Sequence, residues 1–109
     1  MAYDTQLAER IRNLICGRKG FAEKKMFGGI GFLLNGNMCV GIWKDSLIVR
    51  LGPVQAAAAL RQPFVREFDI TGRAMKGWAM VAADGLEDDD ALNEWIRLSS
   101  NFVAKLSPK

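Results

Sequence analysis

The sequence of 109 residues contains no histidine. Histidine is the commonest general base and metal ligand in proteins, and the one side chain whose ordinary pKa lies near neutrality. Its absence leaves the candidate nucleophiles, which are Ser46, Ser99, Ser100 and the two cysteines, without the usual partner base, which a catalytic triad needs within hydrogen-bond reach. We therefore expect a non-enzymatic protein that carries no cofactor and no metal.

Cysteine and long apolar stretches are also scarce. Cys16 and Cys39 are too few and too far apart for a zinc site, and both fall in apolar patterns typical of core residues. No stretch reaches the roughly 20 apolar residues that a membrane helix needs. The N-terminus has no apolar run that ends in a small-residue cleavage site, so nothing predicts export. We expect a cytoplasmic protein without membrane contact.

The composition is that of one globular domain spanning residues 1–109, since half of the residues are hydrophobic and a quarter are charged. The charge is divided unevenly along the chain. Residues 1–83 carry 12 Lys or Arg against 6 Asp or Glu, whereas residues 84–109 carry 3 against 6. The basic first part favours an anionic partner such as nucleic acid, although solvated surface lysines explain it equally well.

The first half of the sequence predicts one helix and three antiparallel strands. Apolar residues at helical spacing follow Asp4 or Thr5, either of which suits an N-cap, and Gly17 ends the helix. Residues 21–25 form a connector or a short edge segment. Strands are predicted at residues 26–34, 38–43 and 46–51, and Asn35-Gly36 is the strongest short hairpin signal because a type I′ turn needs positive φ at both positions.

The second half predicts a helix, two strands and a final helix. Pro53 suits the first position of a helix over residues 54–61, and strands are predicted at residues 64–70 and 73–81. The acidic residues 87–90 open a last helix whose apolar stripe continues to Leu106. Four carboxylates in a row suggest a metal site, but carboxylates at a helix N-terminus also cap free N–H groups, and we interpret them as caps.

Together these elements predict an α+β fold in the order α-β-β-β-α-β-β-α. The fold has two layers, a five-stranded antiparallel sheet with its helices mainly on one face. Gly28-Gly29-Ile30-Gly31 does not match a phosphate-binding loop, because a strand and not a helix follows it. We expect these glycines at a bulge, a sharp bend or a close approach of two backbones.

Basic residues interleave with an aromatic near the end of the predicted sheet. If Lys24, Lys25, Arg50, Arg73, Lys76 and Trp78 share one face, they form a candidate binding site for a nucleic acid or for an aromatic group of a partner. Tryptophan is also an ordinary strand residue, so structure alone accounts for Trp78. A third hypothesis is a small-molecule pocket between sheet and helices, lined by Trp43, Trp78 and Trp95.

Four blocks of the sequence resemble the N-terminal domain of the TfoX (Sxy) family. They are KMFGGIGF at residues 25–32, LNGNM at 34–38, VRLGP at 49–53 and FDITGRAMKGW at 68–78. The resemblance extends from about Phe21 into the last helix. Full-length members carry a second, helical C-terminal domain and this sequence ends at Lys109 before one, so we expect a stand-alone N-terminal domain.

The resemblance implies a bacterial protein with a fold similar to that of type III secretion chaperones. It also implies a part in regulating DNA-transformation competence, where TfoX proteins act as coactivators of transcription and not as enzymes. No site residues come with it, so the blocks are interpreted as fold-defining. Our leading hypothesis is a regulatory or adaptor domain that contacts a protein, with the transcription machinery as a candidate, and that forms a homodimer through a sheet face or edge.

Overall fold

The computed structural model describes residues 3–26, 28–69, 72 and 75–108. These described residues form three α-helices, six strands and one short 3-10 helix. In chain order the elements are α1 (Thr5–Ile15), β1 (Phe21–Met26), β2 (Gly29–Leu34), β3 (Asn37–Trp43), β4 (Ser46–Arg50), α2 (Pro53–Ala59), β5 (Val65–Glu67), β6 (Trp78–Val81), η1 (Ala83–Leu86) and α3 (Asp89–Val103). None of the helices in the described residues is long and apolar enough to cross a membrane.

The strands form one antiparallel sheet in the order β1-β2-β3-β4-β6-β5. The predicted α+β class and antiparallel sheet are confirmed, but the sheet has six strands and not five. The additional strand is β1, which pairs with β2 from Phe21↔Leu34 to Met26↔Gly29. Its sequence, FAEKKM, lacks the apolar alternation of a central strand, because an edge strand buries less of its surface.

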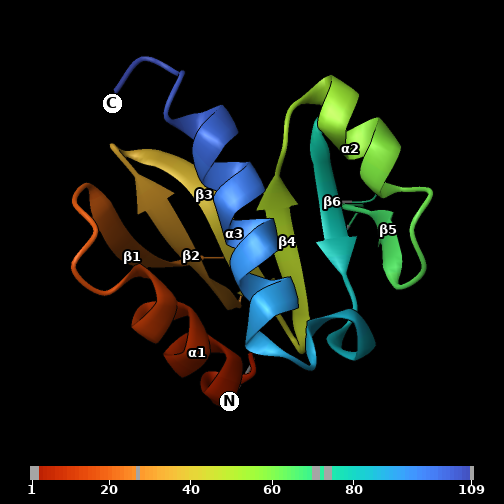
Figure 1. The fold of residues 1–109 in the computed structure, drawn as a ribbon, viewed down its shortest axis with the longest axis horizontal. Coiled ribbons are helices and arrows are strands. Elements are labelled where there is room, and N and C mark those ends of the chain that lie inside the picture. The colour runs from red at the N-terminus through yellow and green to blue at the C-terminus, as the bar shows by residue number, and fades with distance from the viewer. Residues whose placement is uncertain (1–2, 27, 70–71, 73–74, 109) are drawn as a thin grey trace.

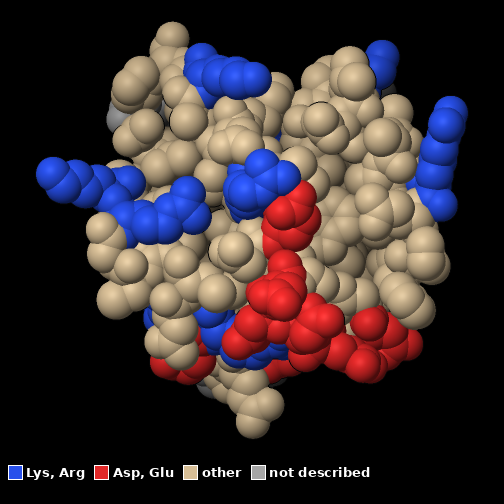
Figure 2. All heavy atoms as spheres, viewed as in Figure 1, with Lys and Arg blue, Asp and Glu red and all other residues tan. Residues whose placement is uncertain are grey.

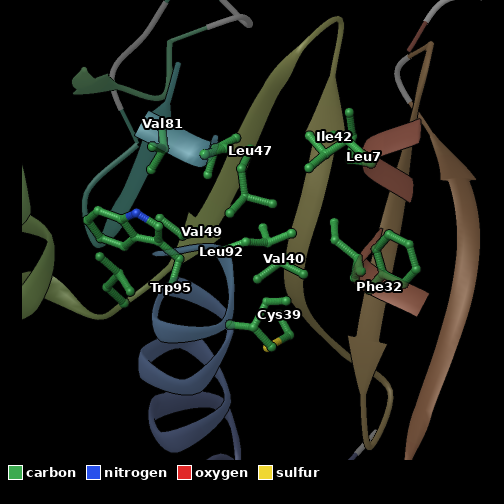
Figure 3. Packing of buried hydrophobic residues seen from close by; sticks show 14 of the residues in the cluster. Leu7, Phe32, Cys39, Val40, Ile42, Leu47, Val49, Val81, Leu92 and Trp95 are labelled. Atoms are coloured by element: carbon green, nitrogen blue, oxygen red, sulfur yellow. The ribbon is translucent and has the colours of Figure 1, made fainter. Parts of the chain in front are cut away.

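All three helices cover the same face of the sheet, as expected (Figure 1). The main core lies between the helices and this face, and we call the opposite side the rear face. Figure 3 shows side chains of β2, β3, β4 and β6 meeting Leu7 of α1 and Leu92 and Trp95 of α3. Ala56 and Ala59 of α2 belong to the same cluster. Their small side chains let the helix lie close to the sheet.

Both long helices begin at the caps that the sequence predicts. The carboxylate of Asp4 accepts hydrogen bonds from the N–H groups of Gln6 and Leu7, at 2.9 and 3.1 Å. The carboxylate of Asp88 accepts from the N–H of Ala91 at 2.7 Å, so the acidic run caps α3.

The Asn35-Gly36 turn forms as predicted, and the glycine run before it matches one of the expected alternatives. Asn35 and Gly36 have φ of 54° and 84°, which is the type I′ geometry of the hairpin between β2 and β3. Gly29 sits where a Cβ would collide with the carbonyl oxygen of Ile42, which confirms a close approach of two backbones. The β-bulge of this hairpin lies elsewhere, between Phe32 and Leu33.

The second half of the sheet is shorter than predicted. Strand β5 has three residues and β6 begins at Trp78, because the chain turns at Lys76 and Gly77. The predicted ends at Ile70 and Arg73 lie outside the described residues. Helix α2 ends at Ala59, two residues before the predicted end at Arg61. The order of elements is otherwise the predicted one.

A second, smaller cluster lies on the rear face. Ile48 of β4 and Met80 of β6 are buried there under Phe68, which follows β5 and is 5 % exposed. Trp43 and Trp78 pack against the edges of this cluster. Phe68 therefore covers part of the face that the helices leave open.

Candidate functional site

A pocket of about 340 Å³ lies between α2 and the turn at residues 75–78. Small residues and three larger apolar ones form most of its wall, and one residue of each charge completes it. The lining residues are Pro53, Ala56, Ala57, Leu60, Glu67, Met75, Lys76, Gly77 and Trp78. The space exists because α2 presents alanine where most helices would present a longer side chain.

The two segments that form the pocket are hydrogen-bonded to each other through Gly77. Its carbonyl oxygen accepts from the N–H of Leu51 at 2.9 Å and from the N–H of Gly52 at 3.0 Å. Gly52 precedes α2 with φ 86° and ψ 161°, a conformation that is essentially restricted to glycine. The start of α2 and the turn are thus held together by backbone contacts.

The turn itself is fixed from its other side. The N–H of Met75 donates to the carbonyl of Phe68 at 3.0 Å, and the N–H of Trp78 donates to the carbonyl of Met75 at 3.2 Å. The Trp78 ring lies 5.6 Å from the Phe68 ring, and the Arg50 guanidinium lies 5.2 Å from the Trp78 ring centre. Cation–π and aromatic contacts of this kind hold an indole in one orientation.

The structure brings together three of the six residues that the sequence proposed as a site. Arg50 and Trp78 are register partners on β4 and β6, and Lys76 lies two residues before Trp78 in the pocket wall. Lys24 and Lys25 are not gathered there, because β1 lies four strand spacings from β6, or about 19 Å. Arg73 lies outside the described residues.

Lys24 and Lys25 are neighbours on β1 and point to opposite faces of the sheet. The preceding residue, Glu23, accepts hydrogen bonds from Arg12 of α1 at 2.7 and 2.8 Å, which places Glu23 and Lys25 on the helix side. Lys24 therefore points to the rear. The proposed six-residue face is wrong in this respect, since a strand cannot present two consecutive side chains to one side.

The rear face has a simple charge pattern. Strand alternation and register place Lys24, Gly31, Gly41, Ile48, Met80 and Arg66 in one row across all six strands. Among the described residues, the charged side chains at rear-facing strand positions are Lys24, Arg50 and Arg66, and all three are cationic.

The helix side has a different pattern. Figure 2 shows its acidic residues gathered at the end where α3 begins, with most cations on other parts of this face. There Arg10 of α1 pairs with Asp89 at 2.9 Å and donates to the carbonyl of Leu86 at 2.6 Å. Within the described residues, no group of three His, Cys, Asp or Glu is arranged to hold a metal ion.

The three tryptophans do not line a common pocket. Trp95 lies in the main core between α3 and the sheet, whereas Trp43 and Trp78 lie on the other side of the sheet. The expected small-molecule pocket between sheet and helices is therefore wrong in its residues. The hydrophobic pattern could not reveal this, because both faces of β3 and β4 are apolar.

Two of the candidate nucleophiles, Cys39 and Ser99, are poorly placed for chemistry, whereas Cys16, which was expected in the core, is exposed. Cys39 is completely buried, and burial raises the pKa of its thiol to about 11, although a contact with the Ser100 hydroxyl at 3.8 Å opposes this. A thiol with such a pKa is almost entirely protonated at neutral pH and is a weak nucleophile. Ser99 is also completely buried, in the helix α3 that packs on the sheet.

A family model described as the TfoX N-terminal domain matches residues 14–103. The chain belongs to this family. The match includes β1 to β6 and both segments that form the pocket. Among curated proteins, no sequence matches this one at a significant level.

Two of the blocks that carry the resemblance meet in this TfoX N-terminal domain at the pocket. VRLGP supplies Arg50, Gly52 and Pro53, and the end of FDITGRAMKGW supplies residues 75–78. The rest of the pocket wall comes from α2, and the sequence analysis did not identify it as part of a site. The run of four alanines at residues 56–59 could have indicated this wall. Such short side chains allow a helix to pack closely, and they also leave room for a pocket beside it.

Proposed function

We propose that this TfoX N-terminal domain is a non-enzymatic regulatory adaptor that works through protein contacts at the apolar surface around the pocket. The observation that carries the proposal is the exposure of large apolar side chains at this surface. Val54 is 83 % exposed beside the pocket and Met75 is 39 % exposed in its wall, two of the three large apolar side chains that are exposed among the described residues. Apolar surface that is retained in this way marks interaction sites.

Family membership and the nucleophiles support the same proposal. The TfoX resemblance suggests that the regulated process is transcription linked to DNA-transformation competence, in the cytoplasm of a bacterium, with the transcription machinery as partner. The lack of histidine and the high pKa of the Cys39 thiol favour binding over catalysis.

The homodimer remains a prediction, and the sheet edges make poor dimer contacts. β1 carries Glu23, Lys24 and Lys25, and β5 is only three residues long. Short or charged edge strands disfavour strand-to-strand pairing. A dimer would therefore use a face, and sedimentation equilibrium at high micromolar concentration will detect it.

In-cell photo-crosslinking tests the adaptor proposal. Benzoylphenylalanine at Val54 should capture a discrete protein in the native bacterium, whereas the same group at Asn13, exposed on α1, should not. Identical products from both positions, or none from Val54, would contradict the proposal.

Nucleic-acid binding is the second candidate, and the cationic rear face favours it. Its signature is a steep fall of affinity with salt, since each neutralised phosphate contributes about 0.9 to the log–log slope. If the protein shows no detectable binding to DNA or RNA at low salt, the nucleic-acid-binding hypothesis is wrong.

A further inference from the structure

We propose that the pocket beside α2 receives one large apolar side chain from an acidic segment of a partner protein. The inference rests on the proposed adaptor function and names the chemistry of the partner. The occupant is an anchor residue, such as tryptophan, phenylalanine, leucine or methionine, with aspartate or glutamate close to it in sequence.

Size and surroundings favour an anchor on a larger body. The pocket volume of about 340 Å³ lies at the low end of the range of about 300–1,000 Å³ that ligand pockets occupy. Met75 in its wall and Val54, which follows the lining residue Pro53 in α2, both expose apolar surface. A ligand that filled only the pocket would leave this surface in water, whereas a polypeptide segment covers it. Interfaces are commonly organised in this way, with a central anchor in a pocket and weaker contacts around it.

The pocket is formed before anything binds. Its two walls are joined by the hydrogen bonds from Leu51 and Gly52 to the carbonyl of Gly77. The Trp78 ring is in contact with both the Phe68 ring and the Arg50 guanidinium. A site whose backbone and main aromatic are already fixed loses little conformational freedom on binding, so an anchor gains affinity there at low cost.

Charge selects an acidic segment. Lys76 lines the pocket and Arg50 lies against Trp78, while Glu67 is the carboxylate among the lining residues. Among the described residues, the charged side chains at rear-facing positions of β4, β6 and β5 are Arg50 and Arg66, and both are cationic. A second copy of this chain that docked pocket to pocket would bring two sets of Lys76 and Arg50 together. An acidic partner pairs with these charges, whereas a copy repels them.

A random dodecapeptide library displayed on phage, panned against the intact protein, supplies the probe. The enriched peptides should share one large apolar residue with Asp or Glu within a few positions. A fluorescent synthetic copy of the best peptide then gives dissociation constants by anisotropy. Amide shifts in the ¹H–¹⁵N spectrum should concentrate at Ala57, Gly77 and Trp78.

Two matched pairs of variants test the anchor and the charge. Ala57→Leu fills the pocket, and Ala58→Leu places the same side chain on the same helix outside it; both alanines are exposed, so both variants should fold. Ala57→Leu should weaken peptide binding by about tenfold or more, and Ala58→Leu by less than about twofold. Lys76→Glu should weaken it by about threefold or more, whereas Lys25→Glu on β1, four strand spacings from β6, should not.

The results separate this inference from the adaptor function. The anchor inference would be overturned if no peptide is enriched, or if the enriched peptides are basic or lack an anchor residue. It would also be overturned if Ala57→Leu and Ala58→Leu have equal effects, or if the protein forms a dimer that Ala57→Leu abolishes. If Val54 captures a cellular protein in spite of such a result, the adaptor function stands without the anchor. If the peptides behave as expected while Val54 captures nothing, the pocket chemistry stands and the adaptor function fails.

Discussion

Replacing Gly52 with alanine should damage the fold at the point where α2 meets the pocket. Gly52 has φ 86° and ψ 161°, and a Cβ built there would lie 2.5 and 2.7 Å from two carbons of the Phe102 ring. The substitution therefore combines backbone strain with a steric clash. Both effects act on the residue that starts α2 and donates to Gly77.

The magnitude follows from these two contributions. A residue other than glycine in this backbone region costs about 1–3 kcal/mol. Moving the Phe102 ring away from its preferred rotamer adds about 0.5–1.5 kcal/mol. We expect a loss of about 3 kcal/mol, which lowers the urea midpoint by about 2 M if the m-value is about 1.5 kcal/mol/M.

Gly17→Ala is the matched control. Gly17 also has positive φ, 82°, but a Cβ there would meet nothing within 4 Å. Only the strain of a left-handed backbone remains, about 1 kcal/mol. Urea unfolding followed by tryptophan fluorescence measures both variants. Phe102→Leu should restore part of the stability of Gly52→Ala, because it removes the ring atoms that clash.

Equal losses in Gly52→Ala and Gly17→Ala would refute the reasoning, since the clash with Phe102 and the special conformation of Gly52 would then carry no cost. A Phe102→Leu substitution that lowers stability by the same amount in both backgrounds would refute the steric part alone.

Three further predictions concern other parts of the molecule. In a thiol titration at neutral pH, exposed Cys16 should react at once and buried Cys39 only after unfolding. Burial raises the pKa of the Cys39 thiol to about 11. The contribution of this thiol to stability should therefore be complete below its ordinary pKa and be lost as the pH rises towards 11. Asn37→Ala should cost about 1–2 kcal/mol in thermal unfolding, because the buried amide donates to the carbonyl of Ser107 at 2.9 Å and ties the end of the chain to the sheet. If the rear face binds DNA through its three cations, the log–log salt slope should be about −2.7, and a slope of zero would contradict such contacts.

Local chemistry explains why much of the fold could be predicted from the sequence. The Asn35-Gly36 turn and the caps Asp4 and Asp88 depend on residues within one turn of the chain, and each is confirmed. The sequence of β1 is compatible with a connector or an edge segment, because the charged residues Glu23, Lys24 and Lys25 hide its pairing with β2. An edge strand needs no apolar pattern on its open side, so periodicity does not identify it.

The candidate site was less predictable because it depends on contacts between distant residues. Arg50 and Trp78 are 28 positions apart and meet only because β6 pairs with β4. Conversely, Lys24 and Lys25 are adjacent in sequence, and the pleat separates them. The two faces of β4 also look alike in the sequence, since Leu47, Ile48 and Val49 are all buried. No single-sequence pattern assigns Trp43 and Trp95 to opposite sides.

The MKGW segment was interpreted as fold-defining, and burial divides it into two kinds of residue. Gly77 is buried and its carbonyl joins the turn to α2, so the backbone geometry constrains it. Met75 and Lys76 are exposed and line the pocket, so the fold does not require their particular side chains. Trp78 does both, since its ring packs on Phe68 and also forms pocket wall. A role in the fold therefore accounts for the glycine and part of the tryptophan, and the proposed anchor site would account for the exposed methionine and lysine.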